Sequence, residues 1–405
     1  MADRNARLLA SLWQQLDATT QERIGQAARA VCAAKEAGKK VAVVVGSGPN
    51  IHEGVTTLIA GLIAAGVIDG ITTSSAVVCH EMGGALERVH RVEADLVGVC
   101  EEKRALDNKA EASLLSEVWL EELKAEMVID EHYYRGLLRL PGDDIIKAAA
   151  NLAYPLGLRT ERLAREAEVL ARAHNSTVEA IAGAGADPLT MMGAAARKGV
   201  PAIVSVPQLV GGGGVGLAIG DAISITERSV RVATLLAEAQ VIIESGIVLT
   251  QEIHDGPLEL YTGHGLWADW QGHSTYSLRG KTVIRIDLDP NLEAAWQQQR
   301  QSSMVAEAIA KGLPKTKLTG IPFRMEMSGF CRLPGSLPII ADLGVVWPLL
   351  ADKVSEQLRM DLPFMSYPQE TPAGQAMRDW IVENVRPVSR IEMLKAARRM
   401  MGGGH

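Results

Sequence analysis

The sequence of 405 residues is poor in aromatic side chains, in cysteine and in long apolar runs. Aromatic residues make up 4% of the chain, so its 47% of apolar residues consists mainly of Ala, Val, Ile and Leu. Val and Ile suit buried strands, and Ala and Leu suit the helices that pack on them. Together with 39 glycines, this composition predicts an α/β fold rather than an all-β fold.

The small number of cysteines and the lack of a block of basic residues argue against several classes of protein. The four cysteines, Cys32, Cys79, Cys100 and Cys331, form no CxxC pair, which argues against a zinc ribbon or a redox motif. No run approaches the roughly 18 to 20 apolar residues of a membrane span, and Met1–Leu16 lacks a signal-peptide core. The net charge is −7 without a basic block, whereas nucleic-acid binding needs a cationic stripe. We therefore expect a cytoplasmic protein with no membrane or nucleic-acid partner.

Six short apolar runs predict strands that are buried on both faces, as in a parallel sheet. The runs are Lys40–Gly46, Ile68–Thr73, Val200–Val206, Ala239–Glu244, Thr282–Leu288 and Pro338–Ala341. Helical stretches separate several of them, which indicates βαβ units with right-handed crossovers. The prediction is a doubly wound, Rossmann-like parallel sheet.

Residues 100–190 have a different pattern, charged and with a helical period. Residues 102–126 alternate in charge around a few Leu and Trp anchors, which is typical of a solvated helical face. We expect a loop at 133–144, two helices over 144–173, and a helical insertion overall. The insertion divides the chain into an N-terminal helix with the first half of the core (1–99), the insertion (100–190), the second half of the core (191–350) and a helical tail (351–405).

The carboxyl ends of the predicted strands are rich in small and polar residues, and open α/β sheets bind ligands at these ends. Small residues let a backbone approach a pyrophosphate, helix N-termini supply N–H donors, and carboxylates bind ribose hydroxyls. The turn at Gly46 is not GxGxxG and is weak evidence alone, but six such strand ends together predict a bound NAD. The residues expected to contact it are Gly46, Ser47, Gly48, Asn50, Thr72, Thr73, Ser74, Ser75, Asp221, Ser245, Gly246, Asp287 and Asp342. For the three aspartates, N-capping of a following helix is the alternative.

Two histidines and a glutamate follow the first two strands. His52 and His80 can move protons near neutrality, and hydrogen bonding at a helix start is the alternative for both. Glu81 can hold a substrate amine or can be an ordinary acid on a helix surface. We expect His52, His80 and Glu81 to be catalytic.

Residues 251–279 form a long polar loop that is rich in Trp, His and Asp. Long loops inside compact domains are functional or disordered. The irregular spacing of its acids and histidines argues against a metal site, so we expect no metal and a substrate pocket or subunit contact instead. The expected substrate residues are His254, Asp255, His264, Trp267 and Asp269.

Two segments resemble known NAD-binding proteins. Residues 43–54 read VVVGSGPNIHEG and residues 70–81 read GITTSSAVVCHE. They resemble the NAD-binding core of deoxyhypusine synthase and of the ornithine cyclodeaminase domain in arginine dihydrolase-type proteins, the LOR/SDH-like group. The turn from Gly46 to Gly54 and the Thr72-Thr73 strand end are similar to the synthase. The cyclodeaminase is matched at His52, Gly54, Ala76 and His80, with Glu81 in place of its Asp.

Later motifs extend the resemblance over about residues 40–350, interrupted at 100–190 and near 300–330. Gly220-Asp221 is similar to a Gly-Asp whose carboxylate binds the NAD ribose in the synthase, and Lys281–Pro290 resembles a strand of the cyclodeaminase. Residues 340–344 resemble the last strand of both. Each motif is short, and their order along the chain is the specific part.

The chain departs from both families at reactive positions. The nearest counterpart of the synthase's imine-forming lysine is Lys281, which opens a predicted strand, and no Lys-His-His motif follows Gly246. Ser75 and Gly83 replace the cyclodeaminase's Asn and second acid. The cofactor site is therefore better matched than either reaction.

The resemblance implies an NAD-dependent enzyme that acts on a small amine or amino acid by transient hydride removal and C–N bond chemistry. The expected activity is a lyase of the ornithine cyclodeaminase type, in a homo-oligomer (dimer or tetramer). One alternative is an aminoalkyl transferase like deoxyhypusine or homospermidine synthase, which an imine-forming lysine would favour. The other is a non-catalytic nucleotide-binding protein.

Overall fold

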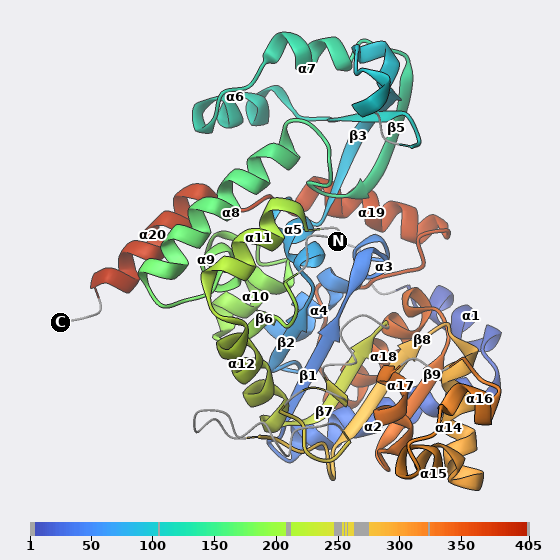
Figure 1. Cartoon of the computed structure of the whole chain (residues 1–405). Helices are drawn as coiled ribbons and strands as arrows, with labels where there is room; N and C mark the ends of the chain where they lie inside the picture. The colour runs from blue at the N-terminus through green and yellow to red at the C-terminus, as the bar shows by residue number, and fades with distance from the viewer. Residues whose placement is uncertain are drawn as a thin grey trace.

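A six-stranded, all-parallel sheet lies at the centre of the structure (Figure 1). The structure is a computed structural model that describes residues 5–103, 106–207, 212–246, 253–254, 256, 258–262, 275–322 and 325–402. In spatial order the strands are β6 (Ala202–Val204), β2 (Gly70–Thr73), β1 (Lys40–Val45), β7 (Ala239–Ser245), β8 (Thr282–Asp287) and β9 (Ser336–Ile340). Every neighbouring pair is parallel. The predicted doubly wound α/β sheet and its six strands are confirmed.

The order of these strands creates a crevice. Numbered along the chain within this sheet, they run 3-2-1-4-5-6, the order of dinucleotide-binding doubly wound sheets. Strands β1 and β7 are neighbours, but the chain continues from β1 toward β2 and from β7 toward β8. The connections after β1 and β7 leave in opposite directions, which makes the space between their carboxyl ends the topological switch point where open α/β sheets bind ligands; we call this space the crevice.

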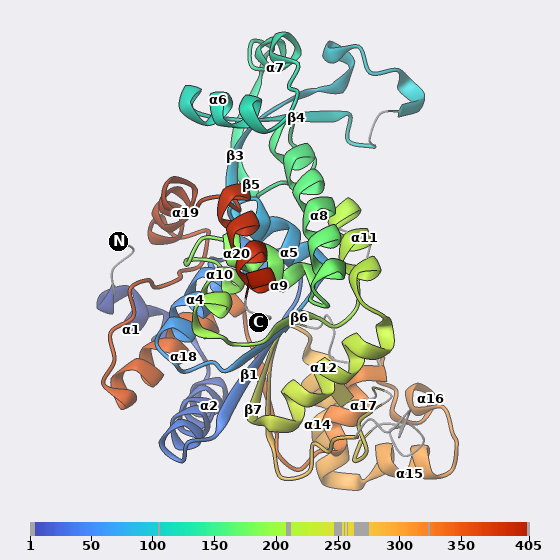
Figure 2. The same ribbon diagram turned by 90° about the vertical axis from the view of Figure 1, so that its left-hand side faces the viewer.

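Alternate residues of the central strands face two separate cores, which explains why the strands read as continuous apolar runs. Val41, Val43 and Val45 of β1 pack into a core with α2 (Ala18–Glu36), α4 (Val55–Ala64) and α18 (Leu343–Leu358). Ala42 and Val44 face the opposite core, together with α12 (Ile225–Glu238), α14 (Pro290–Ser302) and α17 (Met325–Arg332). Helices therefore cover both faces of the sheet (Figure 2).

A second, three-stranded antiparallel sheet stands above the core in Figure 1. It has the order β4 (Lys109–Ser113), β3 (Leu86–Glu93) and β5 (Gly142–Ala148), and it carries α6 (Glu117–Glu126) and α7 (Glu131–Leu137). The expectation that 100–190 is helical throughout is wrong, since β4 and β5 lie within it. So is the expectation of a loop at 133–144, where α7 ends and β5 begins. The stretch with alternating charge, residues 102–126, contains both the strand β4 and the helix α6. The rest of the segment contains the helices α8 (Leu156–Ala173) and α9 (Val178–Gly185), and α10 (Met191–Lys198) follows directly after it.

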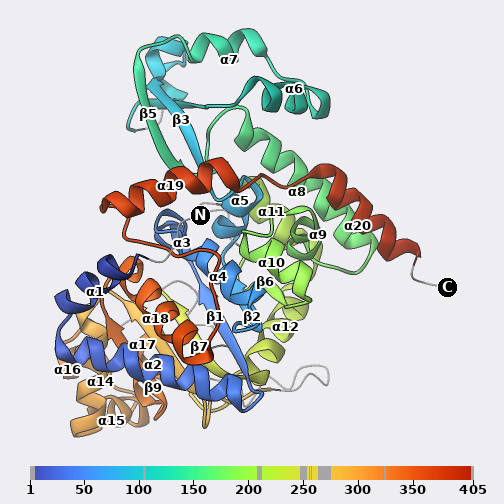
Figure 3. The ribbon, with the colours of Figure 1, turned by 180° about the vertical axis from the view of Figure 1, so that it is seen from behind.

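The C-terminal segment returns to the junction of the two sheets. Helix α19 (Pro372–Asn384) lies between the small sheet and the core, and α20 (Arg390–Gly402) continues along α8 and α9 (Figure 3). The remaining elements are α1 (Ala6–Gln15), α3 (Ser47–His52), α5 (Ser75–Met82), η1 (Ala94–Val97), η2 (Glu101–Lys103), α11 (Gly213–Ala222), α15 (Met304–Ala310) and α16 (Lys315–Thr319). Over the described ranges, no helix is both long and apolar enough to cross a membrane.

A buried ion pair fastens α12 to the edge strand β6. Arg228 Nη1 lies 2.5 Å from Glu179 Oε1, and the two side chains are 0% and 1% exposed. The same guanidinium donates to Val204 O and Ile219 O, while Glu179 Oε1 also accepts from Val204 N. Removing one partner would leave a buried charge without its counter-ion.

We predict that Arg228→Met lowers the free energy of unfolding by about 3–5 kcal/mol, because Glu179 loses its cation in a dry site. Urea denaturation followed by circular dichroism measures this. Arg231→Met is the matched control on the same helix; Arg231 pairs with Glu227 at the surface, where a pair contributes about 0–1 kcal/mol. An equal or smaller loss in Arg228→Met than in the control would contradict the account.

Candidate active site at the carboxyl ends of β1 and β7

Asn50 joins the ends of the two strands that flank the crevice. Its Nδ2 donates to Gly46 O at 2.5 Å and to Ser245 O at 3.1 Å. Ser245 Oγ donates to Asn50 Oδ1 and accepts from Trp347 Nε1 at 2.7 Å. Asn50 and Ser245 are fully buried, so these two predicted cofactor residues hold the crevice in shape. Trp347, from α18, was not predicted.

Glycines form the rim of the crevice. Gly246 has φ 83°, a left-handed conformation that favours glycine, and a Cβ there would lie 4.0 Å from Asn50 Nδ2. A Cβ on Gly48 would lie 3.8 Å from His52 Cδ2. Ser47 is the first residue of α3, which starts directly after Gly46. Backbone without side chains at this edge lets a phosphate come close, so the residues present fit a dinucleotide.

His52 and His80 lie near one another beside this crevice. Burial, together with the smaller effects of the neighbouring Arg378, His80 and Lys147, lowers the pKa of His52 to about 4. Burial also lowers the pKa of His80, whose Nδ1 donates to Ala149 O at 2.7 Å. Both rings are therefore neutral near pH 7, and the Nε2 of His80 carries the lone pair that can accept a proton.

Three further groups surround the histidines, and sequence reasoning did not find them. Arg378 of α19 lies 3.5 Å from His52 Nδ1 through Nη2, which also donates to Ile146 O at 2.6 Å. Glu53 directly follows His52, and Lys147 projects from β5. The His-Glu pair after the glycine turn was a signal for Glu53. No local pattern pointed to Arg378, which is 326 residues from His52 in sequence.

Glu53 is a second group that can exchange protons near neutrality. Burial raises the pKa of Glu53 to about 7, and the nearby Asp342 and Glu370 carboxylates add to the rise, while the hydrogen bond from Gln369 N opposes it. That bond joins Gln369 N to Glu53 Oε2 at 2.8 Å. A carboxyl group that titrates close to pH 7 is suited to general acid or base work.

The strand-end hydroxyls and aspartates have structural partners. Thr73 Oγ1 donates to Val45 O, and Ser74 Oγ accepts from Val77 N to cap α5. Asp342 Oδ1 caps α18 by accepting from Gly344 N, and Asp287 Oδ1 accepts from Asp289 N in a turn. Capping leaves other lone pairs of these groups available, so their contacts to NAD stay predictions. Thr72 and Ser75 are buried at the same edge.

Glu81, which was expected to be catalytic, has structural partners for its carboxylate. The side chain is fully buried, and its two carboxylate oxygens accept from Met191 N at 2.7 Å and from Met192 N at 3.0 Å. Glu81 therefore holds the start of α10 and has no oxygen directed at a substrate. Burial raises the pKa of Glu81 to about 7.

Two other predicted residues lie away from the strand ends or have structural partners, and their roles stay predictions. Asp221 lies at the far end of α11, with its side chain 57% exposed and 3.6 Å from Arg165. His254 is fully buried, with Nε2 2.7 Å from Glu244 Oε1 and its ring against Phe330. The other expected substrate residues, Asp255, His264, Trp267 and Asp269, lie outside the described residues. Within the described part of the chain, no three His, Cys, Asp or Glu side chains are arranged to hold a metal ion.

Solved structures resemble this fold at low identity. Models of known families and curated proteins give no match. The chain is similar to a conserved LOR/SDH protein of Methanococcus maripaludis S2, with 13% identity and a TM-score of 0.40 over 85% of this chain and 71% of that one. It is also similar to ArgZ, an arginine dihydrolase from the ornithine-ammonia cycle in cyanobacteria (12% identity, TM-score 0.39, 83% of this chain and 31% of that one). A third similar structure is AgrE in a ternary complex with ornithine and NAD+ (14% identity, TM-score 0.40, 84% of this chain and 34% of that one).

The expected resemblance to the LOR/SDH-like group is thus found as a structural similarity, and the chain spans about a third of the length of ArgZ and AgrE. Because identity and TM-score are low, the activity of this chain has to be inferred from its own residues.

We predict that His52 stays neutral as the pH falls from 8 to 5.5, and that His80 protonates at a lower pH than an ordinary histidine, because burial opposes the protonation of both. The ¹³C chemical shifts of labelled histidine, assigned with His52→Gln and His80→Gln, measure this. His90 is the internal control, since a hydrogen bond to Asp144 raises its pKa. Protonation of His52 or His80 at or above pH 6.5 would contradict the description of the site.

The same shift predicts a pH dependence of stability. In the unfolded chain His52 binds a proton near pH 6.5, whereas in the folded chain it does so only near pH 4. The contribution of His52 to stability is therefore present above pH 6.5 and is lost as the pH falls toward 4.

Proposed function

We propose that this chain is an NAD-dependent enzyme that acts on a small amine or amino acid. It would remove hydride transiently from a carbon that bears nitrogen, as a lyase of the ornithine cyclodeaminase type. The observation that carries the proposal is the crevice between β1 and β7, where glycine backbone and two neutral histidines lie together. A homo-oligomer is part of the proposal.

NAD fits the residues at this edge. Gly46, Gly48 and Gly246 would hold the pyrophosphate through their backbone, and the carboxylates of Asp287 and Asp342 are placed at strand ends where ribose hydroxyls bind. When bound, NAD supplies the hydride acceptor. The protein has to orient the substrate, exclude water and move protons.

The side chains around the crevice divide these tasks. Arg378 would bind a substrate carboxylate, since a guanidinium pairs with carboxylates by charge-assisted hydrogen bonds, and its buried Nε has no hydrogen bond within the described residues. His80 would accept a proton at Nε2 from the substrate nitrogen. Glu53, with its pKa near 7, would return a proton to the departing amine.

An aminoalkyl transferase fits the lysines less well. Lys281 donates to Ala237 O and Ala239 O at the amino end of β8. It therefore lies at the amino ends of the strands, whereas the crevice lies at their carboxyl ends. Lys147 lies near the histidines, but its Nζ contacts Glu111 and donates to Asn151 O at 2.9 Å. Neither ammonium is presented as a nucleophile, and this favours the lyase.

We predict that Gly48→Ala weakens NAD binding at least tenfold while the fold is kept. The added methyl group meets only ordinary contact distance inside the protein, at 3.8 Å from His52, but it occupies space that a phosphate needs. Isothermal titration with NAD measures the effect. Gly61→Ala is the matched control, because its methyl group meets Pro363 at the same 3.8 Å inside α4, away from the crevice. Equal NAD affinity in both variants would show that the turn at Gly48 is not part of the NAD-binding site.

We also predict that His80→Gln lowers kcat about 100-fold or more without changing NAD affinity, because a positioned base contributes about 10²–10⁴-fold. Ammonia release from ornithine, arginine and related amines in the presence of NAD measures turnover. His132→Gln on the exposed surface of α7 is the control. Full activity in His80→Gln would refute its role as base. If the wild type binds NAD but transforms no amine, the non-catalytic alternative holds.

A further inference from the structure

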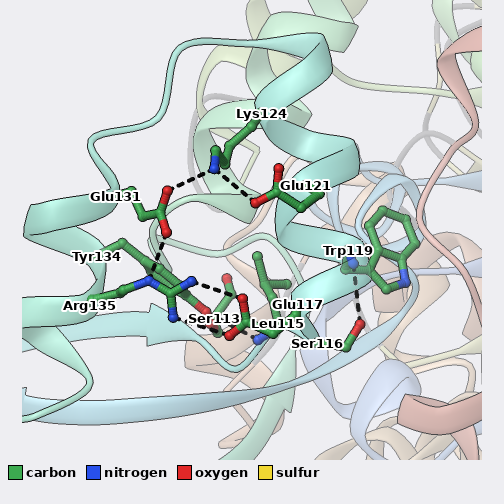
Figure 4. A network of polar contacts seen from close by, with 10 residues as sticks. All are labelled: Ser113, Leu115, Ser116, Glu117, Trp119, Glu121, Lys124, Glu131, Tyr134 and Arg135. Atoms are coloured by element: carbon green, nitrogen blue, oxygen red, sulfur yellow. Dashed lines mark hydrogen bonds and ion pairs between the residues drawn. The ribbon is translucent and has the colours of Figure 1, made fainter.

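A pocket of about 170 Å³ lies where the small sheet meets the end of α19. Its polar lining includes Glu87 of β3 and Ser113 of β4, and its apolar lining includes Leu115, Leu156 and Val385, with Trp119 at one side. Figure 4 shows Ser113, Leu115 and Trp119 of this wall, next to the ion pairs that hold α6 against α7. The pocket is smaller than the roughly 300–1,000 Å³ of drug-sized sites, so it suits a short chain.

The carboxyl group of Glu87 has an incomplete set of partners. The residue is 6% exposed. Its Oε1 accepts from Ala150 N at 2.8 Å. Oε2 and the Ser113 hydroxyl are buried and interact with each other, and neither has a further hydrogen-bond partner among the described residues. A buried carboxylate that lacks a cation is costly, so such a group points to a ligand.

Two of the cations near Glu87 are paired with other groups. Lys147 stands opposite Glu87 in the β3–β5 ladder, but its Nζ contacts Glu111 and Asn151 O. Arg88 pairs with Asp379 at 2.5 Å. Arg386 lines the pocket from an exposed position. A cation that reaches Glu87 would therefore have to enter from the pocket.

We propose that this pocket binds a short alkylammonium group, with its nitrogen on Glu87 and Ser113 and its carbon chain against the surrounding leucine and valine side chains. A primary ammonium supplies three donors, which matches the lone pairs of Glu87 Oε2 and of the Ser113 hydroxyl, two groups that interact only with each other among the described residues. The apolar walls bury the methylene groups at about 0.8 kcal/mol each. The site is separate from the crevice and does not depend on the proposed function.

The pocket is nevertheless connected to the candidate active site. His80 Nδ1 donates to Ala149 O, and Glu87 Oε1 accepts from the N–H of the next residue, Ala150. Ala150 has φ 59°, an uncommon conformation for a residue with a Cβ. A ligand on Glu87 and the imidazole of His80 would therefore both interact with the peptide segment Ala149-Ala150.

The test is isothermal titration of the full chain with n-butylammonium chloride at pH 8, without NAD. We expect saturable binding to the wild type and at least tenfold weaker binding to Glu87→Gln, which keeps the acceptor for Ala150 N but removes the charge. Glu117→Gln is the matched control, since its carboxylate pairs with Arg135 outside the pocket, and binding should equal the wild type. Ser113→Ala, expected to weaken binding severalfold, tests the site if Glu87→Gln fails to fold.

The pH dependence gives a second readout. Burial raises the pKa of Glu87 to about 7, against the opposing effects of the Ser113 hydroxyl, the Ala150 N–H and Lys147, and Glu111 adds to the rise. Because the ammonium requires the ionised carboxylate, affinity should increase from pH 6 to pH 8 in the wild type and stay constant in Glu87→Gln. Equal binding of n-butanol, stronger binding of butyrate, or unchanged affinity in both pocket variants would overturn the proposal. Since NAD is absent, failure here leaves the proposed function untouched.

Discussion

The bond network of Asn50 is the constraint on which the candidate site depends. A space tends to form between neighbouring parallel strands whose connections run in opposite directions. The buried polar groups that line this space need hydrogen-bond partners. Asn50 supplies them by donating to the carbonyls of Gly46 and Ser245, and Trp347 donates to the hydroxyl of Ser245. The glycine turns then lie at a fixed separation, with backbone rather than side chains at the rim. A ligand would meet a preformed surface.

Buried acids are used largely to hold elements together. Glu81 binds two N–H groups at the start of α10, Glu179 pairs with Arg228, and Glu244 pairs with His254. These partners satisfy carboxylates that would otherwise be costly to bury. Beside the crevice, burial lowers the pKa of His52 and of His80 and raises that of Glu53. The proposed function assigns proton transfer to His80 and Glu53.

The sequence predicted the parts of the molecule that follow from local pattern. Apolar runs such as residues 41–45 identified every strand of the parallel sheet, and the glycine turn marks the end of β1 where the candidate site lies. The small sheet was missed because its strands, such as residues 87–92 and 109–113, contain several charged residues and so share the composition of exposed helices. Arg378 could not be predicted, since only the return of α19 across the small sheet brings it to His52. The partners of Glu81 could not be predicted either, because they come from a helix that begins 110 residues later.

Hydrogen–deuterium exchange with and without NAD tests the central claim most directly, because it reports where the dinucleotide binds. The account predicts slower amide exchange on addition of NAD in the segment that joins β1 to α3, around Gly46 and Asn50, and at the end of β7 around Gly246. Exchange in β4 and α6 of the small sheet should stay the same. Protection confined to other segments, or none at saturating NAD, would show that the crevice between β1 and β7 is not a dinucleotide site.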